Sequence, residues 1–431
     1  MTRRTARLPS PIRARLEEGS SLEWVSSLLG IGHPISEDAR VSKTDATALL
    51  GRIALRDGRT LLVPMGPAVT GIGSLRLYRP QKLGPRIWRT LLIVALRTGV
   101  ARRVLQKARA LVQGPSAGNR GDATFLLDSL REMFGHRDIV FGLHFGAPGP
   151  VRKPVVAIMT EGGDFLGFAK IGWNEQTVSL VENEKRCLEA LALHPLKSGR
   201  FPTVLRYARW DGRCMLVTAP LPLHRGRRED RKLGPVHLQF LIEVAAISRA
   251  RESFARSGFF SRLQGRLSHL TDVIPAGPAS IPGKALDFLA STLGSADIPW
   301  VWRLGDFTPW NAGVEKGARR IACIDLEYAE KESIPGWDIF HFLSHAAGRN
   351  ARGADVVSTA QRRCRAYFEA LDIGPRLIPA LYVAYLLDLY TLWARIWARH
   401  DGQLTPPAAR ALSRLIRLAD QSMRTQEAQK P

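Results

Sequence analysis

The sequence has few cysteines and no long uninterrupted apolar run. Its 431 residues include only four cysteines, Cys187, Cys214, Cys323 and Cys364, which lie far apart with no CxxC pair. We therefore expect neither a zinc site nor a disulfide framework, and we predict reduced, mostly buried thiols. The apolar run at 90–96 is far too short to span a bilayer. No apolar stretch follows the basic start of the chain, so we expect no signal peptide and a cytoplasmic location.

Acidic residues are scarce relative to basic ones. The chain has 39 aspartates and glutamates against 62 lysines and arginines, a formal net charge of +23. A surplus of this size attracts anionic partners, so nucleotides, phosphosugars, anionic lipid and nucleic acid are all candidates. The sequence shows no recognisable reading helix or aromatic platform, and we expect no specific nucleic-acid partner. The length and the ordinary hydrophobic content predict two to three globular domains.

The N-terminal part of the chain is mixed in character. Residues 1–20 are basic and proline-interrupted, as in a flexible tail. We predict an α/β extension of unknown role over 21–120, with a helix at 45–53 and strands at 60–65 and 74–80. A segment rich in glycine and small polar residues marks its end.

The segment 85–113 carries apolar residues at helical spacing with arginines between them. Gly99 is expected to divide it into two helices. One interpretation is an amphipathic helix packed on its own domain with a solvated basic face. The other is a basic helix lying on an anionic membrane surface, which predicts a peripheral membrane contact.

The rest of the chain changes from strands to helices. Within 121–222 we predict a helix, then successive strands with the EGGD hairpin turn, a helix over 180–193, and two strands flanking the turn DGR. Residues 223–431 are mainly helical, and the helix over 377–400 is apolar on more than one side, which favours burial. The predicted fold class is α+β.

Polar residues with a definite chemistry gather between Val301 and Glu327. Asp306 is followed five positions later by Asn311, and Asp325 ends an apolar run that has the character of a buried strand. This pattern can bring one carboxamide and one carboxylate onto the same divalent cation. The other carboxylate is then left to accept a proton from an attacking hydroxyl. Mg²⁺ suits such a site because it prefers few hard oxygen ligands.

The motifs LGDFTPWN and CIDLEYAEKESIPGWDIFHFL resemble the catalytic core of the aminoglycoside phosphotransferase and choline kinase group, relatives of the protein kinases. The resemblance implies a protein-kinase-like fold of two lobes over about 135 to 400, with a strand-rich N-lobe and a helical C-lobe. It implies that Asp306 is the catalytic base, that Asn311 and Asp325 bind the metal, and that Asp338 supports the loop.

The same resemblance extends to the predicted N-lobe. Lys170 matches the phosphate-binding lysine, and Glu184 is the candidate for its ion-pair partner, although Glu182 and Glu189 lie on the same helix. The segment FGLHFGAPGP at 141–150 lies where a loop would cover the nucleotide. It does not match the glycine signature of protein kinases.

The resemblance predicts a magnesium-dependent phosphotransferase that moves the γ-phosphate of ATP, or of another nucleoside triphosphate, to a hydroxyl of a small-molecule acceptor. The sequence departs from the family at Leu304, where the family carries a histidine that braces the loop. The alternative is therefore a catalytically weak or inactive kinase-like scaffold that binds nucleotide. His341 and His345 could form a metal pair, but without a third ligand nearby we interpret them as packing residues.

Overall fold

A computed structural model describes most of the chain between Ala48 and Ala398. The predicted tail at 1–20 and the glycine-rich segment at 114–123 lie outside the described residues. The described ranges are 48–55, 58–78, 83–101, 106–110, 125–135, 138–146, 149–210, 212–221, 232–248, 250–271, 276–315, 320–346 and 353–398. The chain divides into two compact units, Met1–Val181 with Val204–Pro220, and Glu182–Thr203 with Leu221–Pro431.

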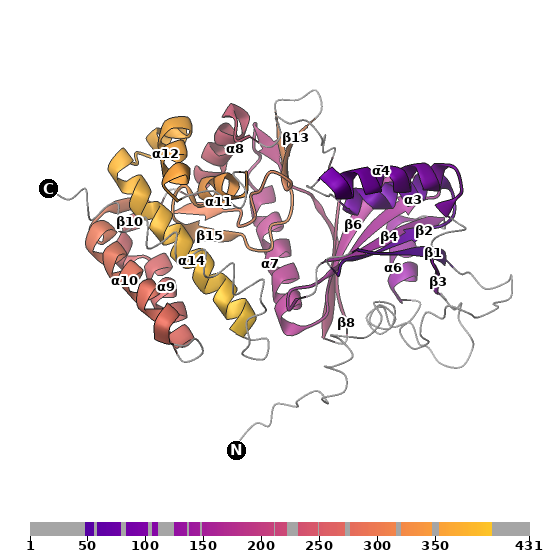
Figure 1. The fold of residues 1–431 in the computed structure, drawn as a ribbon. Helices are drawn as coiled ribbons and strands as arrows, with labels where there is room; N and C mark the ends of the chain where they lie inside the picture. Colours follow the sequence, from indigo (N-terminus) through magenta and orange to yellow (C-terminus); the bar gives the residue numbers. More distant parts are fainter. Residues whose placement is uncertain are drawn as a thin grey trace, which may run out of the picture. The chain divides into compact units, whose positions relative to one another are not determined.

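The first unit is built on an eight-stranded sheet in which neighbouring strands run antiparallel (Figure 1). Its strand order is β3-β1-β2-β4-β5-β6-β9-β8. The bounds are β1 Ala48–Ala54, β2 Thr60–Pro64, β3 Gln106–Ala110, β4 Ile139–Phe145, β5 Pro154–Thr160, β6 Phe165–Gly172, β8 Val204–Trp210 and β9 Arg213–Thr218.

Helices cover both faces of this sheet. Successive side chains of a strand point to opposite faces, so Leu62 joins one hydrophobic cluster while Leu61 and Val63 join the other. Helix α6 (Phe125–Phe134) contributes Leu130 to the first cluster. The second cluster includes residues of the helical elements on the other face, which are α3 (Ala68–Ser74), η1 (Leu75–Leu77) and α4 (Leu83–Arg97).

Three predictions for the N-terminal part are wrong. The segment predicted as a helix at 45–53 forms β1, because Leu50 and Ile53 pack on opposite faces of the sheet and the strand pairs on both edges. The predicted strand at 74–80 is the end of α3 followed by η1. Beyond Gly99 the chain is helical at Ala101, but residues 106–110 form β3, so a second helix does not extend over the rest of the predicted segment. Tertiary pairing therefore overrides local propensity in this region.

The predicted hairpins are confirmed. The EGGD turn joins β5 to β6, and the DGR turn joins β8 to β9. Helix α7 (Glu175–Ala192) follows β6, as predicted. Strand β2 pairs with β4, so the predicted extension and the predicted N-lobe contribute to one sheet.

The second unit is mainly helical, which together with the sheet of the first unit confirms the α+β class. Helix α14 packs against α9, α10, α11 and α12 (Figure 1). The helix bounds are α8 Pro235–Ala245, α9 Gly258–Thr271, α10 Ala276–Leu293, α11 Trp337–Ala346, α12 Gly353–Arg363, α13 Arg365–Ala370 and α14 Ile378–Ala398, with the short turns η3 Phe254–Arg256 and η5 Pro375–Leu377.

Three small sheets complete the second unit. They pair β10 with β11, β12 with β15, and β13 with β14 and β7. The bounds are β7 Gly199–Arg200, β10 Arg251–Ser253, β11 Asp297–Pro299, β12 Val301–Arg303, β13 Ala312–Val314, β14 Ile321–Cys323 and β15 Glu330–Ser333. Two of these sheets frame the segment that carries the candidate site.

The last helix and the four cysteines are buried, as the sequence predicts. Among the described helices, the segment Pro375–Ile396 is long and apolar enough to cross a membrane, but 78% of its apolar window is buried inside the protein. This burial is what the apolar faces of the last predicted helix indicate. All four cysteines are free and buried, as predicted.

Candidate active site

Asp306, Asn311 and Asp325 lie on a loop and a hairpin of the second unit. The loop leaves β12 at Arg303 and enters β13 at Ala312. The β13 and β14 strands pair with Ala312 opposite Cys323, and the Ile324 amide donates to the Asn311 carbonyl at 2.9 Å. The hairpin therefore brings Asn311 next to the strand end that Asp325 follows, although 14 positions separate them in sequence.

Asn311 holds the carboxylate of Asp306. Its side-chain Nδ2 donates to Oδ2 of Asp306 at 2.7 Å and to the Asp306 carbonyl at 3.2 Å. Asn311 is buried, whereas the Asp306 side chain keeps 27% of its surface exposed. The carboxylate is thus oriented by the protein and still reachable by a substrate. An amide that donates through Nδ2 also offers Oδ1 as a hard oxygen ligand.

Asp338 fixes the start of the loop. It is buried at the beginning of α11, and its two oxygens accept from the Leu304 amide at 2.8 Å and the Gly305 amide at 3.1 Å. Gly305 has a φ of +83°, and a Cβ there would lie 2.2 Å from the Tyr328 carbonyl oxygen, so only glycine fits. Asp338 therefore contacts the first two residues of the loop through both carboxylate oxygens, and its supporting role stays a prediction.

Three carboxylates converge beside this loop. One oxygen each from Glu184, Asp325 and Glu327 lie within 4.8 Å of one another. Glu184 comes from α7, where its carboxylate also accepts from the Leu326 amide at 3.4 Å. Asp325 adopts a φ of +70°, a left-handed conformation that is uncommon outside glycine and that clusters at functional sites. The donor set is all hard oxygen and strongly negative, which fits a divalent cation such as Mg²⁺.

Burial and the neighbouring carboxylates both act on the pKa of nearby groups. Burial, and then the charges of Asp338, Asp306 and Asp325, raise the pKa of the Cys323 thiol well above its usual value. Burial raises the pKa of Asp338 itself to about 6, although the two backbone amides act in the opposite direction. A positive ligand would relieve this accumulation of negative charge.

The predicted phosphate-binding lysine and its predicted ion-pair partner belong to different units. Lys170 lies half-buried on β6, opposite Val155 of β5. Glu184 is the buried member of the three glutamates considered on its helix, since Glu182 is half-buried and Glu189 pairs with Lys185 on the surface. The ion pair between Lys170 and Glu184 stays a prediction.

The predicted nucleotide-covering segment at 141–150 comprises the second half of β4 and the start of the connection to β5. Gly142 lies inside β4 and not in the turn, and a Cβ there would lie 2.1 Å from Oγ of Ser74. Its function is therefore close packing against α3. Gly146 and Gly149 border the turn, and the two residues between them lie outside the described part of the chain.

Sequence reasoning missed the contact between His341 and Asp306. Nε2 of His341 lies 3.3 Å from Oδ1 of Asp306, and Nδ1 lies 3.2 Å from the Tyr385 hydroxyl. Burial, and then the charge of Arg303, lower the pKa of His341 to about 3, so the ring is neutral. An ionised carboxylate only accepts, so Nε2 carries the proton and Nδ1 accepts from Tyr385.

His341 therefore contacts Asp306 where Leu304 cannot. The Leu304 side chain is apolar and buried. His345 makes its Nδ1 contact with the His341 carbonyl at 2.9 Å, so this nitrogen is not directed to a shared metal. In the sequence, the signal for His341 was the spacing of four residues between the two histidines. The signal for Glu327, which joins the carboxylate cluster, was its position two residues after Asp325.

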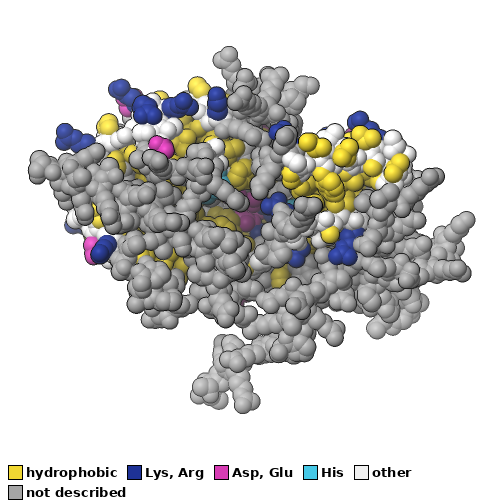
Figure 2. All heavy atoms as spheres, viewed as in Figure 1, with side chains coloured by type: hydrophobic (Ala, Val, Ile, Leu, Met, Phe, Trp, Pro, Cys, Tyr) yellow, Lys and Arg dark blue, Asp and Glu magenta, His cyan; other side chains and the backbone are white. Residues whose placement is uncertain are grey.

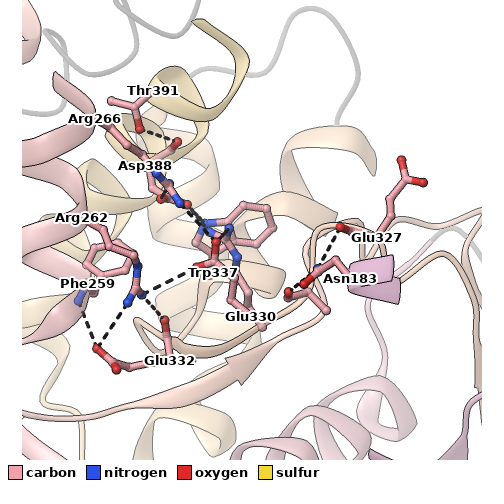
Figure 3. Close-up of polar contacts among 12 residues, drawn as sticks. Asn183, Phe259, Arg262, Arg266, Glu327, Glu330, Glu332, Trp337, Asp388 and Thr391 are labelled. Atoms are coloured by element: carbon pink, nitrogen blue, oxygen red, sulfur yellow. Dashed lines mark hydrogen bonds and ion pairs between the residues drawn. The ribbon is translucent and has the colours of Figure 1, made fainter. Parts of the chain in front are cut away.

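A buried ionic network supports the loop from behind. Arg303, the last residue of β12, pairs with Asp388 and, at 2.8 Å, with Glu330. Arg266 joins the same two carboxylates at 2.8 and 3.2 Å, and Nε1 of Trp337 donates to Asp388 at 3.0 Å (Figure 3). The network connects β12, β15, α9, α11 and α14, so it fixes the strand that precedes Asp306.

The backbone after Asp325 is held as well. Asn183, beside Glu184 on α7, donates from Nδ2 to the carbonyls of Glu327 at 3.0 Å and Ala329 at 2.9 Å (Figure 3). Two neighbouring residues of one helix thus contact the segment that carries Asp325 and Glu327.

No protein-family model matches the sequence, and no curated protein matches it. The chain resembles the solved GDP complex of wild-type aminoglycoside 2'-phosphotransferase-IIIa, with 13% identity, a TM-score of 0.46, and coverage of 70% of this chain and 99% of the other. It also resembles an ethanolamine kinase of Plasmodium vivax, with 12% identity, a TM-score of 0.44, and coverage of 72% and 89%. An aminoglycoside phosphotransferase of Alicyclobacillus acidocaldarius has 13% identity, a TM-score of 0.39, and coverage of 66% and 92%.

These solved structures are of the kinds that the sequence motifs resemble.

Proposed function

We propose that this protein is a small-molecule kinase that transfers the γ-phosphoryl group of ATP, or of another nucleoside triphosphate, to a hydroxyl of a small acceptor. One observation carries the proposal. Asp306, oriented by Asn311 and His341, belongs to the same unit as the carboxylates of Asp325, Glu327 and Glu184. Phosphoryl transfer requires a group that accepts the proton of the acceptor hydroxyl and carboxylates that bind a divalent cation.

In this proposal Asp306 orients the acceptor hydroxyl and accepts its proton. Asn311 donates to one oxygen of Asp306 and His341 to the other, so the carboxylate is held before the substrate arrives. Catalysis of this kind consists mainly of positioning and charge neutralisation, so few residues are required.

The residues that would hold Mg²⁺ are Asp325 and Asn311, as the resemblance implies, with Glu327 and Glu184 close enough to Asp325 to take part. Mg²⁺, when bound, supplies neutralisation of the phosphate charge. Lys170 is proposed to bind the phosphates from the sheet of the first unit. A cytoplasmic location, where nucleoside triphosphates are available, is part of the proposal.

The alternative is a kinase-like scaffold that binds nucleotide without turnover. The observation that favours it is Leu304, whose side chain offers no polar atom to the loop. The contact from His341 to Asp306 favours the enzyme, since it supplies a polar brace from another element.

A screen of acceptors with γ-labelled ATP and Mg²⁺ tests the proposal. Aminoglycosides, sugars, and choline-like or ethanolamine-like amino alcohols make up the panel. We expect label transfer by the wild-type chain and its loss in Asp306→Asn, because the amide cannot accept the proton. Asp287→Asn, an exposed aspartate on α10, is the matched control and should keep full activity. Nucleotide binding with no transfer to any acceptor would favour the scaffold.

A further inference from the structure

Helix α4 exposes an apolar stripe to solvent. Eight large hydrophobic residues are exposed among the residues that the structure describes, and six of them fall between 69 and 100. Figure 2 shows hydrophobic side chains gathered over this helix. We define the α4 outer face by its exposed apolar residues, which are Ile87 (53% exposed), Trp88 (38%), Leu91 (62%) and Val94 (50%).

Apart from Trp88, whose ring also contacts Tyr78, the α4 outer face is not the side that packs on the protein. Leu92 and Leu96 are buried and belong to the hydrophobic cluster beneath the helix. Ile87, Leu91 and Val94 recur at spacings of four and three, so they line another side of the same helix. A helix that serves only its own domain has a polar outer face, and an apolar patch of this kind marks an interaction surface.

The stretch of sequence that carries this face has charges of one sign. The sequence contains no aspartate or glutamate between Asp57 and Asp122. Arg86 and Arg97 are exposed on α4 itself. The basic residues of this stretch are Arg59, Arg76, Arg79, Lys82, Arg86, Arg89, Arg97, Arg102, Arg103, Lys107, Arg109 and Arg120. The partner that such a charge favours is anionic.

The helix is held against its own unit in a fixed position. Nε of Arg89 donates to the Leu75 carbonyl at 3.3 Å, and the ring of Trp88 meets Tyr78 edge-on with 6.2 Å between the centroids. A rigid helix that presents isoleucine, tryptophan and leucine with arginines beside them has the composition of an interfacial membrane helix. Tryptophan in particular is enriched at the membrane–water interface.

We propose that the α4 outer face docks on an anionic lipid surface, with the helix axis in the membrane plane. The aliphatic side chains and Trp88 enter the boundary between headgroups and acyl chains, and the arginines contact lipid phosphates. The lipid surface is favoured over a protein partner because the apolar stripe is one helix wide and every charged residue of the sequence stretch that carries it is basic. This inference is independent of the proposed kinase activity.

Co-sedimentation of the full-length protein with vesicles tests the inference. One set of vesicles is phosphatidylcholine alone, and the other is phosphatidylcholine mixed with phosphatidylglycerol. We expect binding to the anionic vesicles only, weakened by salt. The double substitution Ile87→Glu with Leu91→Glu should weaken the partition by about tenfold or more, because it places charge in the apolar stripe. The control is Leu193→Glu, which changes an exposed leucine away from α4 and should leave binding unchanged.

Three results would overturn the inference. One is the absence of binding to anionic vesicles. Another is an equal loss of vesicle binding in the control and the double variant, or no loss of vesicle binding in either. Such a result would assign the binding to net charge alone. The last is a concentration-dependent dimer in analytical ultracentrifugation that the double variant abolishes while vesicle binding persists, which would make a second copy the occupant. Because all three positions are exposed, circular dichroism and thermal unfolding should show that the variants stay folded.

Discussion

The buried ionic network behind the loop predicts a large effect of Arg303→Met on stability. Arg303 is 1% exposed and pairs with Asp388, which is 2% exposed as a side chain, so the substitution leaves a buried carboxylate with fewer partners. Removing one partner of a buried ion pair costs about 3 to 5 kcal/mol of the free energy of unfolding. Asp388 keeps Arg266 and Trp337 as partners, which places the expected cost near the lower end, about 3 kcal/mol.

Differential scanning calorimetry of the full chain measures this effect. A loss of about 3 kcal/mol should lower the Tm of the helical unit by roughly 6 to 12 °C, given the usual scaling for a unit of this size. The matched control is Arg365→Met. Its ion pair with Glu369 is exposed, with 75% and 58% of the two side chains accessible, so the cost should be about 0.5 kcal/mol or less.

A second substitution shows whether the Tm decrease in Arg303→Met comes from the unpaired charge of Asp388 or from the loss of the arginine side chain itself. Asp388→Leu added to Arg303→Met removes both charges of the pair and should recover part of the loss. A Tm decrease for Arg303→Met no larger than that of Arg365→Met would refute the reasoning. It would mean that the network does not stabilise the strand before Asp306.

Two further predictions concern the loop. His341→Phe removes the neutral donor to Asp306 and should lower kcat about tenfold with little change in the KM for nucleotide. His341→Gln should retain part of the rate. A wild-type kcat in the Phe variant would contradict the positioning role of His341. Asp338 has a pKa raised to about 6, so the native state binds this proton more tightly than the unfolded chain, and stability should fall as the pH rises from about 4 to about 6. Asp338→Asn should abolish this decrease in the free energy of unfolding, which is up to about 3 kcal/mol, so the Tm difference from wild type should change across this window. A Tm difference that is constant with pH would exclude the raised pKa of Asp338.

Local patterns in the sequence predict much of the fold. The EGGD and DGR turns are read correctly because glycine and polar residues between alternating apolar runs favour hairpins. The segment at 45–53 is misread because its alanines and leucines favour a helix, while pairing with two neighbouring strands decides its structure. The addition of β1 to β3 to the same sheet depends on contacts between distant residues, which composition does not show.

The candidate site divides in the same way. Asp306, Asn311 and Asp338 belong to the motifs that carry the resemblance, and the structure brings Asn311 to Asp306 and Asp338 to the start of the loop. His341 lies on α11 with Asp338, but its contact with Asp306 has no counterpart in the motif, and Glu184 reaches Asp325 from a helix about 140 positions earlier. These contacts depend on packing between elements, so the sequence alone indicates the residue types but not their partners.

The most direct test of the central claim is nucleotide binding that depends on Mg²⁺ and on Asp325. Wild-type protein is heated with ATP, with and without Mg²⁺, beside Asp325→Ala and the exposed control Asp287→Ala. We predict a higher Tm for wild type and for the control only when nucleotide and Mg²⁺ are both present, since a ligand at about 100 times its Kd adds about 2.7 kcal/mol. Asp325→Ala should lose this shift. No shift in wild type at any Mg²⁺ concentration, or an undiminished shift in Asp325→Ala, would contradict the account.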